Sequence, residues 1–273
     1  MTRRPRSGLP RHLPDPVPTA RRPVRRVRAL SAARRLRDAG VCGPHPRLGR
    51  GEVFAAARRL AGDASALHLA GDAVTAEEVR DAIAAAAGPF NGSRAAIDPD
   101  RVLAAATRAG TRLGAVADTG RRIAFATAQP ASLLPLYGAL ARASRAAGAT
   151  VLELDHSGPY TSGRSLWWHD DVAVAVGDGQ LWAETHLAAG DEWLFAVGRP
   201  DLVVADGVFA VAAIGAGVET VAFADLDAPA PALAAHRGLP VEVVTVSGHR
   251  PPAAYHPVRD LILAGVTGPR PTQ

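Results

Sequence analysis

Short apolar runs alternate with helix-like segments from residue 118 onward, and this alternation limits the fold more than any other feature of the sequence. Each run is rich in β-forming residues, and a helical stretch that can return the chain follows most of them. The runs are RIAFAT (122–127), TVLEL (150–154), DLVVAD (201–206), ETVAFAD (219–225) and PVEVVTV (240–246). We therefore expect residues 118–273 to form a Rossmann-like α/β domain with a mostly parallel sheet.

One stretch interrupts this alternation. Residues 165–186, SLWWHDDVAVAVGDGQLWAETH, read as an antiparallel meander that turns at Asp170–Asp171 and again at 177–179. The predicted sheet therefore carries an antiparallel insertion.

The part of the chain before residue 118 has a different pattern. Residues 1–24 are rich in arginine and proline without periodicity, which predicts a disordered leader. Residues 25–117 read as a helical region, with helix starts indicated by Thr75 three residues before Glu78 and by Asp98 before Pro99.

Charge is unevenly distributed along the chain. Residues 1–50 hold 14 arginines against Asp15 and Asp38, a balance of +12, whereas residues 51–273 hold 17 arginines and 24 acidic residues, a balance of −7. No aromatic residues are interleaved with the N-terminal arginines, which argues against nucleic-acid binding. The chain has no lysine, a single cysteine and no long apolar run. We expect a cytoplasmic protein without a membrane span, and the sequence leaves a homo-oligomer open.

Polar residues follow three of the predicted strands, at the edge of a parallel sheet where ligands bind. Asp206, Asp225 and Asp227 could together hold a hard cation such as Mg²⁺ through their oxygens. The turn before the next helix could cradle a phosphate, since helix N-termini favour anions. The residues of this turn are Thr127, Ala128, Gln129 and Ser132. The alternative for each aspartate is a helix cap.

The end of the meander supplies a candidate for proton transfer. His186 could act as a general acid or base, with Glu184 beside it and Asp206 as a further catalytic candidate. The alternative is that His186 is a surface or packing residue.

The motifs FATAQPASLL (125–134), ETHL (184–187) and AFADLDAPAP (222–231), with others over roughly residues 98–265, resemble those of a family of actinobacterial proteins known as phosphatases. FATAQPASLL (125–134) is similar to the family's FATGHPAGLL, and ETHL (184–187) to HTHS. AFADLDAPAP (222–231) is similar to GFADCNDPAL, and TVSGHRPPAAYHPV (245–258) to PLDDNVPPHLYEPL. DLVVADGVFAVAAIGAG (201–217) is similar to DLVVADHGWAGAAG. The resemblance implies a shared fold and pocket.

The chain departs from these motifs at several chemical positions. Gln129 and Glu184 stand where the family has histidines, and Ser247 and Gly248 where it has two aspartates. Such losses are typical of a diverged family member.

Taken together, the sequence predicts a phosphatase-like protein that hydrolyses a small phosphomonoester with the help of a divalent metal ion. The first alternative is a non-catalytic binder of a phosphorylated metabolite. The second is a regulatory or structural partner subunit.

Overall fold

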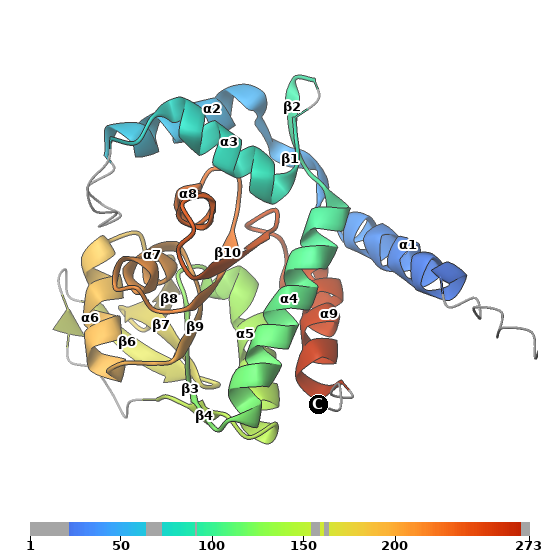
Figure 1. The fold of residues 1–273 in the computed structure, drawn as a ribbon. Coiled ribbons are helices and arrows are strands. Elements are labelled where there is room, and N and C mark those ends of the chain that lie inside the picture. Colours follow the sequence, from blue (N-terminus) through green and yellow to red (C-terminus); the bar gives the residue numbers. More distant parts are fainter. Residues whose placement is uncertain (1–21, 64–72, 91, 154–158, 161–163, 269–273) are drawn as a thin grey trace, which may run out of the picture.

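The computed structural model of this chain describes residues 22–63, 73–90, 92–153, 159–160 and 164–268. In this part of the chain, a nine-stranded sheet has the order β11-β10-β9-β3-β7-β6-β5, with β4 also beside β3 and β8 beside β7 (Figure 1). Its strands are β3 (Arg122–Thr127), β4 (Thr150–Val151), β5 (Pro159–Tyr160), β6 (Arg164–His169), β7 (Val172–Gly177), β8 (Gln180–Trp182), β9 (Leu202–Asp206), β10 (Thr220–Ala224) and β11 (Val241–Thr245).

Six of these strands are parallel, which confirms the predicted α/β fold class. β4 is shorter than predicted and pairs only with Arg122 and Ile123 of β3. Further along the same edge of β3, β7 pairs in parallel with Ala126 and Thr127. The meander is therefore part of the main sheet, because its middle strand continues where β4 stops.

The strand order reverses beside β3. From β3 the chain goes first to β4 and β7 on one side, and then returns to β9, β10 and β11 on the other. In sheets of this kind, the crevice at the carboxyl ends of the strands on either side of the reversal is the usual ligand site. Here those strands are β3 and β9.

Helices cover both faces of the sheet, as the alternating side chains of β3 require. Ile123 and Phe125 belong to a core shared with α4, α5 and α9, whereas Ala124 and Ala126 pack with α6 and α7. These helices are α4 (Pro99–Asp118), α5 (Pro130–Ala146), α6 (Leu187–Val197), α7 (Gly207–Gly215), α8 (Ala230–His236) beside β11, and α9 (His256–Thr267) after the 3₁₀ turn η2 (Pro252–Tyr255).

The structure corrects one prediction about the α/β part and confirms another. Helix α6 was not predicted, because LAAGDEWLFAV has few polar residues to mark an exposed helix face. Both meander turns are confirmed: Asp170, Asp171, Asp178 and Gly179 all have positive φ, as two-residue hairpin turns require.

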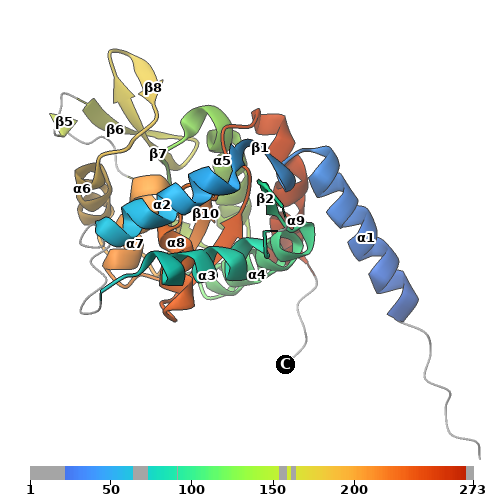
Figure 2. The ribbon, with the colours of Figure 1, turned by 90° about the horizontal axis from the view of Figure 1, so that it is seen from above.

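Helices α2 and α3 of the N-terminal region lie across the carboxyl edge of the sheet, whereas α1 projects to the side (Figures 1 and 2). The structure confirms Thr75 and Asp98 as side-chain N-caps. It also adds a two-stranded antiparallel sheet that the prediction of an all-helical region missed. The elements are α1 (Arg22–Asp38), β1 (Gly43–Gly49), α2 (Arg50–Gly62), α3 (Ala76–Ala87) and β2 (Arg94–Ile97). Of the predicted leader, residues 22–24 belong to α1, and residues 1–21 lie outside the described part.

Helix α4, the last helix of the N-terminal region, makes two close backbone contacts with α9, at Gly110 and at Gly114. A Cβ atom on Gly110 of α4 would lie 2.4 Å from the Ile262 carbonyl oxygen of α9, so the two helices touch backbone to backbone.

Among the described helices, none combines the length and apolar character that a membrane-spanning segment needs.

Candidate functional site

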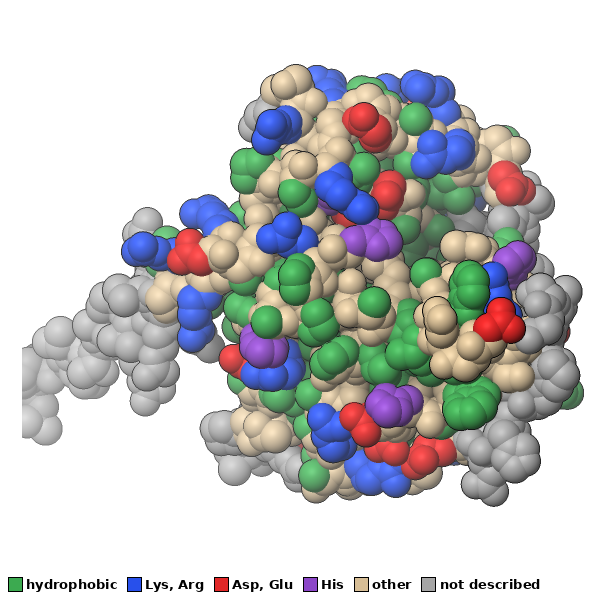
Figure 3. Space-filling view, turned by 180° about the vertical axis from the view of Figure 1, so that it is seen from behind, with side chains coloured by type: hydrophobic (Ala, Val, Ile, Leu, Met, Phe, Trp, Pro, Cys, Tyr) green, Lys and Arg blue, Asp and Glu red, His purple; other side chains and the backbone are tan. Residues whose placement is uncertain are grey.

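A pocket of about 480 Å³ opens at the reversal of strand order. The turn after β3, the start of α7 and the loop after β10 form three of its sides, and α2 and the loop after β8 form the others. Seen from behind, the molecular surface is hollowed between its upper and lower parts, and hydrophobic side chains gather around the hollow (Figure 3). Location and shape together make this pocket the candidate site.

One face of α2 forms the upper wall. Ala56, Arg59, Leu60 and Asp63 line the pocket, and their spacing of i, i+3, i+4 and i+7 places them on one side of the helix. The side chain of Arg59 is exposed and brings a positive charge to the pocket. The sequence analysis proposed no site residue before residue 118, so this contribution was missed.

The predicted phosphate turn is largely closed on itself. The N–H of Gln129 donates to the Thr127 hydroxyl over 3.0 Å, and the N–H of Ala128 donates to Asp206 Oδ1 over 3.2 Å. Thr127 and Ser132 are buried, and only Ala128 and Gln129 reach the pocket wall. The cradle therefore lacks two of the N–H donors that the prediction assigned to it.

Asp206 lies beneath the pocket and not on its wall. Its side chain is buried, and burial raises the pKa of the carboxyl to about 7. The nearby hydroxyls of Thr127 and Tyr137 and the N–H of Ala128 favour the charged form and lower this pKa. As the residue before α7, Asp206 makes no side-chain cap, so the predicted alternative of a helix cap is wrong for this residue.

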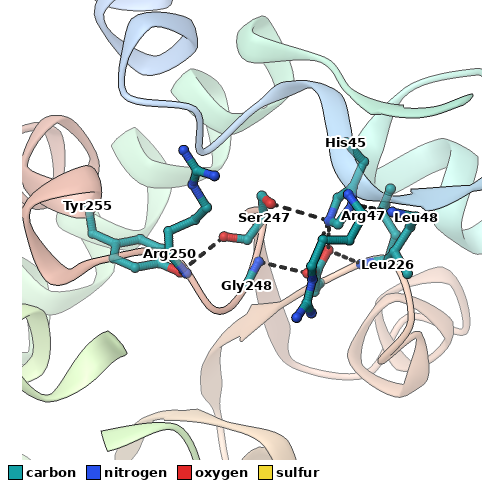
Figure 4. Close-up of polar contacts among 9 residues, drawn as sticks. His45, Arg47, Leu48, Leu226, Ser247, Gly248, Arg250 and Tyr255 are labelled. Carbon is teal, nitrogen blue, oxygen red and sulfur yellow. Dashed lines mark hydrogen bonds and ion pairs between the residues drawn. The ribbon is translucent and has the colours of Figure 1, made fainter. Parts of the chain in front are cut away.

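Asp225 forms a buried cluster with His45 and Ser247, and the last two are labelled in Figure 4. Its Oδ1 and Oδ2 lie 3.0 and 3.2 Å from His45 Nε2, and Ser247 Oγ lies 3.2 Å from the same nitrogen. The N–H groups of Leu226 and Gly248 also donate to the Asp225 carboxylate, each over 2.7 Å. This carboxylate is fully occupied by the protein itself.

Glu184 and His186 do interact, as their spacing suggested. The Nδ1 of His186 lies 2.8 Å from Glu184 Oε1, which also accepts from the N–H groups of Thr185 and His186. Arg164 Nη1 lies 3.3 Å from Glu184 Oε2. Glu184 is buried and lines the pocket, whereas His186 is exposed at the start of α6, next to the lining residue Thr185.

The three predicted metal ligands do not converge. Asp206 is turned toward Ala128, Asp225 toward His45, and only Asp227 lines the pocket. Within the described residues, no group of three histidine, cysteine or carboxylate side chains lies close enough to hold a metal ion. The donor set therefore does not fit the predicted three-aspartate site for Mg²⁺.

His249 is a further residue of the pocket wall, which the sequence analysis did not propose. It lines the pocket with a left-handed backbone, at φ 53°. A non-glycine residue with positive φ is uncommon and is often associated with function. Because φ cannot be read from a sequence without a turn motif, no local signal pointed to His249.

The fold and the pocket define an α/β protein with a candidate small-molecule site at the reversal of its strand order. Comparison with known proteins adds a family: residues 79–268 match the family model described as Phosphatase, and the chain belongs to that family. It is 34% identical over 176 residues to a protein of Streptomyces coelicolor that is named a phosphatase. The similarity covers 61% of this chain and 66% of that relative, slightly less than two thirds of its length.

Proposed function

We propose that this protein is a phosphatase that hydrolyses a small phosphomonoester bound in the pocket. One observation carries the proposal: the first turn of α7 and Arg59 of α2 line the pocket together. The first N–H groups of a helix have no partner within it, and the helix dipole adds positive charge there. A phosphate would be held between these N–H groups and the guanidinium group.

The size and lining of the pocket favour a small ester with an apolar body. A volume of about 480 Å³ is in the range of small-molecule sites. Its wall consists mainly of apolar residues, among them Leu60, Val208, Val211 and Phe223. These surfaces match an aromatic or aliphatic group better than a sugar, whose hydroxyls need many polar partners.

His186 is the proposed proton carrier. If Nδ1 donates to the Glu184 carboxylate, the ring is held in one orientation and Nε2 is left for proton transfer. An acid at this place would protonate the leaving alkoxide, and a base would activate water. No step is assigned to a metal ion, because the predicted ligands lie apart.

A second candidate is a non-catalytic binder of a phosphorylated metabolite. The observation in its favour is that Asp206 and Asp225, which were expected to serve hydrolysis, hold the protein's own backbone. Binding through α7 and Arg59 does not need these carboxylates.

Turnover and binding separate the two candidates. Hydrolysis of p-nitrophenyl phosphate is measured with EDTA and with added Mg²⁺ or Mn²⁺, and binding of inorganic phosphate is measured by calorimetry. We expect Arg59→Ala to weaken binding by about 10- to 100-fold, the usual value of a charged hydrogen bond. Arg58→Ala is the matched control, because Arg58 is exposed on the same helix and does not line the pocket. Binding without turnover would favour the binder, and equal effects of the two variants would contradict the proposed site.

A further inference from the structure

We propose that His45 is a positioning residue, which holds α2 where Arg59 faces the pocket. Its hydrogen bonds to Asp225 and Ser247 connect the N-terminal region to the carboxyl ends of β10 and β11 (Figure 4). The effect of His45 on ligand binding rests on the proposed function, whereas its effect on α2 does not.

The hydrogen bonds of His45 define its tautomer. Its Nδ1 accepts from the N–H of Leu48 over 2.8 Å and from the N–H of Arg47 over 3.2 Å. Because Nδ1 is an acceptor, the ring proton of the neutral form lies on Nε2, which donates to the Asp225 carboxylate. Both ring nitrogens are therefore used, one by its own chain segment and one by the sheet.

The cluster of His45, Asp225 and Ser247 is buried, so the loss of its hydrogen bonds would destabilise the folded protein. The side chain of His45 has 0% exposure and that of Asp225 has 4%. A buried hydrogen-bonding group that loses its partner destabilises the folded state, because no water can replace the partner. A second bond supports the same connection: the N–H of Ser247 donates to the Val41 carbonyl oxygen over 2.8 Å.

The connection passes from His45 to α2 through a short segment. Helix α2 begins at Arg50, five residues after His45. The N–H of Gly49 donates to the Glu52 carboxylate over 2.8 Å, which ties this segment to the first turn of the helix. A shift of His45 would therefore move α2.

Arg59 depends on α2 for its position. Its side chain is exposed, and it lines the pocket only because α2 crosses the carboxyl edge of the sheet (Figure 2). Both β1 and α2 precede residue 79, where the match to the family model begins. The upper wall of the pocket is thus supplied by the N-terminal region, and His45 fixes that wall to the family's sheet.

Two substitutions test this role. His45→Leu removes both hydrogen-bonding functions, whereas His45→Gln keeps an N–H that can reach Asp225. His169→Leu is the control, since His169 is an exposed histidine at the end of β6 that does not line the pocket. Amide hydrogen exchange is measured on all variants, and KM and kcat for p-nitrophenyl phosphate are measured beside the affinity for inorganic phosphate.

In His45→Leu we expect exchange in α2 to increase at least about tenfold, with α9 unchanged, because the loss of the cluster frees α2 locally. KM and the phosphate dissociation constant should rise about tenfold with little change in kcat, and His45→Gln should restore part of the affinity. In an Arg59→Ala background, His45→Leu should weaken binding no further, because both residues act through one contact.

Three results would overturn the proposal. They are unchanged exchange in α2, an equal increase of exchange throughout the chain, and full additivity of His45→Leu with Arg59→Ala. If the wild-type protein binds no phosphate and turns over no ester, the proposed function fails, and the exchange in α2 still decides whether His45 positions that helix.

Discussion

The backbone N–H of Ala128 donates a hydrogen bond to the carboxylate of Asp206, 78 positions further along the chain. This bond joins the turn after β3 to the end of β9, the two strands between which the sheet order reverses. A residue that was expected to face a ligand is thereby used to build the floor below it.

Asp206 should make the stability of the protein depend on pH. Burial raises its pKa to about 7 in the folded protein, whereas an aspartate in the unfolded chain titrates near the ordinary value of about 3.9. The folded state therefore binds the proton of Asp206 more tightly than the unfolded chain does. The resulting stabilisation of the folded state is complete below about pH 4 and is lost as the pH rises to about 7. A difference of about three pKa units between the folded and unfolded states corresponds to at most about 4 kcal/mol in the free energy of unfolding.

In Asp206→Asn the carboxyl cannot ionise. We expect the midpoint of thermal unfolding to vary less between pH 4 and 7 than in the wild type. Asp201→Asn is the control, because the Arg122 N–H and the nearby arginines lower the pKa of Asp201, so its contribution to stability changes below about pH 4 and the profile between pH 4 and 7 should keep the wild-type shape. An unchanged pH profile in Asp206→Asn would contradict the assignment.

Gly207→Ala should destabilise the protein by about 2–4 kcal/mol. Gly207 has φ 55°, which costs a residue with a Cβ about 1–2 kcal/mol, and its new Cβ would lie 2.6 Å from that of Ala128, which adds the cost of overpacking. Urea unfolding measures the effect.

Gly217→Ala is the matched control for this substitution. Gly217 has φ 71° and no atom within 4 Å of an added Cβ, so only the backbone cost applies there. Adding Ala128→Gly to Gly207→Ala should recover part of the stability. Equal losses at both glycines would show that the contact with Ala128 has no effect.

Gly110→Ala should weaken the contact between α4 and α9 by about 1–3 kcal/mol, because the added methyl group would overlap the Ile262 carbonyl group. At an open helical position the same change is favourable by up to about 1 kcal/mol. Gly51→Ala in α2 provides that comparison, since nothing lies within 4 Å of its added Cβ. Denaturant unfolding measures the change in the free energy of unfolding, which should be a decrease for Gly110→Ala and an increase for Gly51→Ala. An increase for Gly110→Ala would refute the close crossing.

His186→Ala should lower kcat for p-nitrophenyl phosphate by about 10²–10⁴, the usual contribution of a general acid or base. Glu184→Gln should lower it less and change the pH dependence of kcat, because the amide supports the imidazolium form less well than the carboxylate. His256→Ala is the control, since His256 is an exposed histidine in the first turn of α9. A kcat in His186→Ala that equals the wild-type value would remove His186 from the mechanism.

The sequence alone determined the central strands of the main sheet and the edge at which the candidate site lies. The ends of RIAFAT, DLVVAD and ETVAFAD are local features, because a change from apolar to polar residues ends a strand wherever it is placed. Phe223 of β10 pairs with Asp206 of β9, and Ala126 of β3 pairs with Ala205 of β9. These registers confirm that the three strand ends share one edge of the sheet. The caps at Thr75 and Asp98 and the two meander turns are local for the same reason.

Tertiary structure decided which of these residues face the pocket. Whether an aspartate at a strand end faces a ligand or a backbone N–H depends on the neighbouring turn, and for Asp206 that turn lies 78 positions away. The pairing of His45 with Asp225 spans 180 positions and requires β1 to cross the ends of β10 and β11. Arg59 reaches the pocket only because α2 follows β1. Such contacts arise from the packing of distant segments. Periodicity and motifs depend on neighbours in the chain, so they do not indicate which distant segments meet.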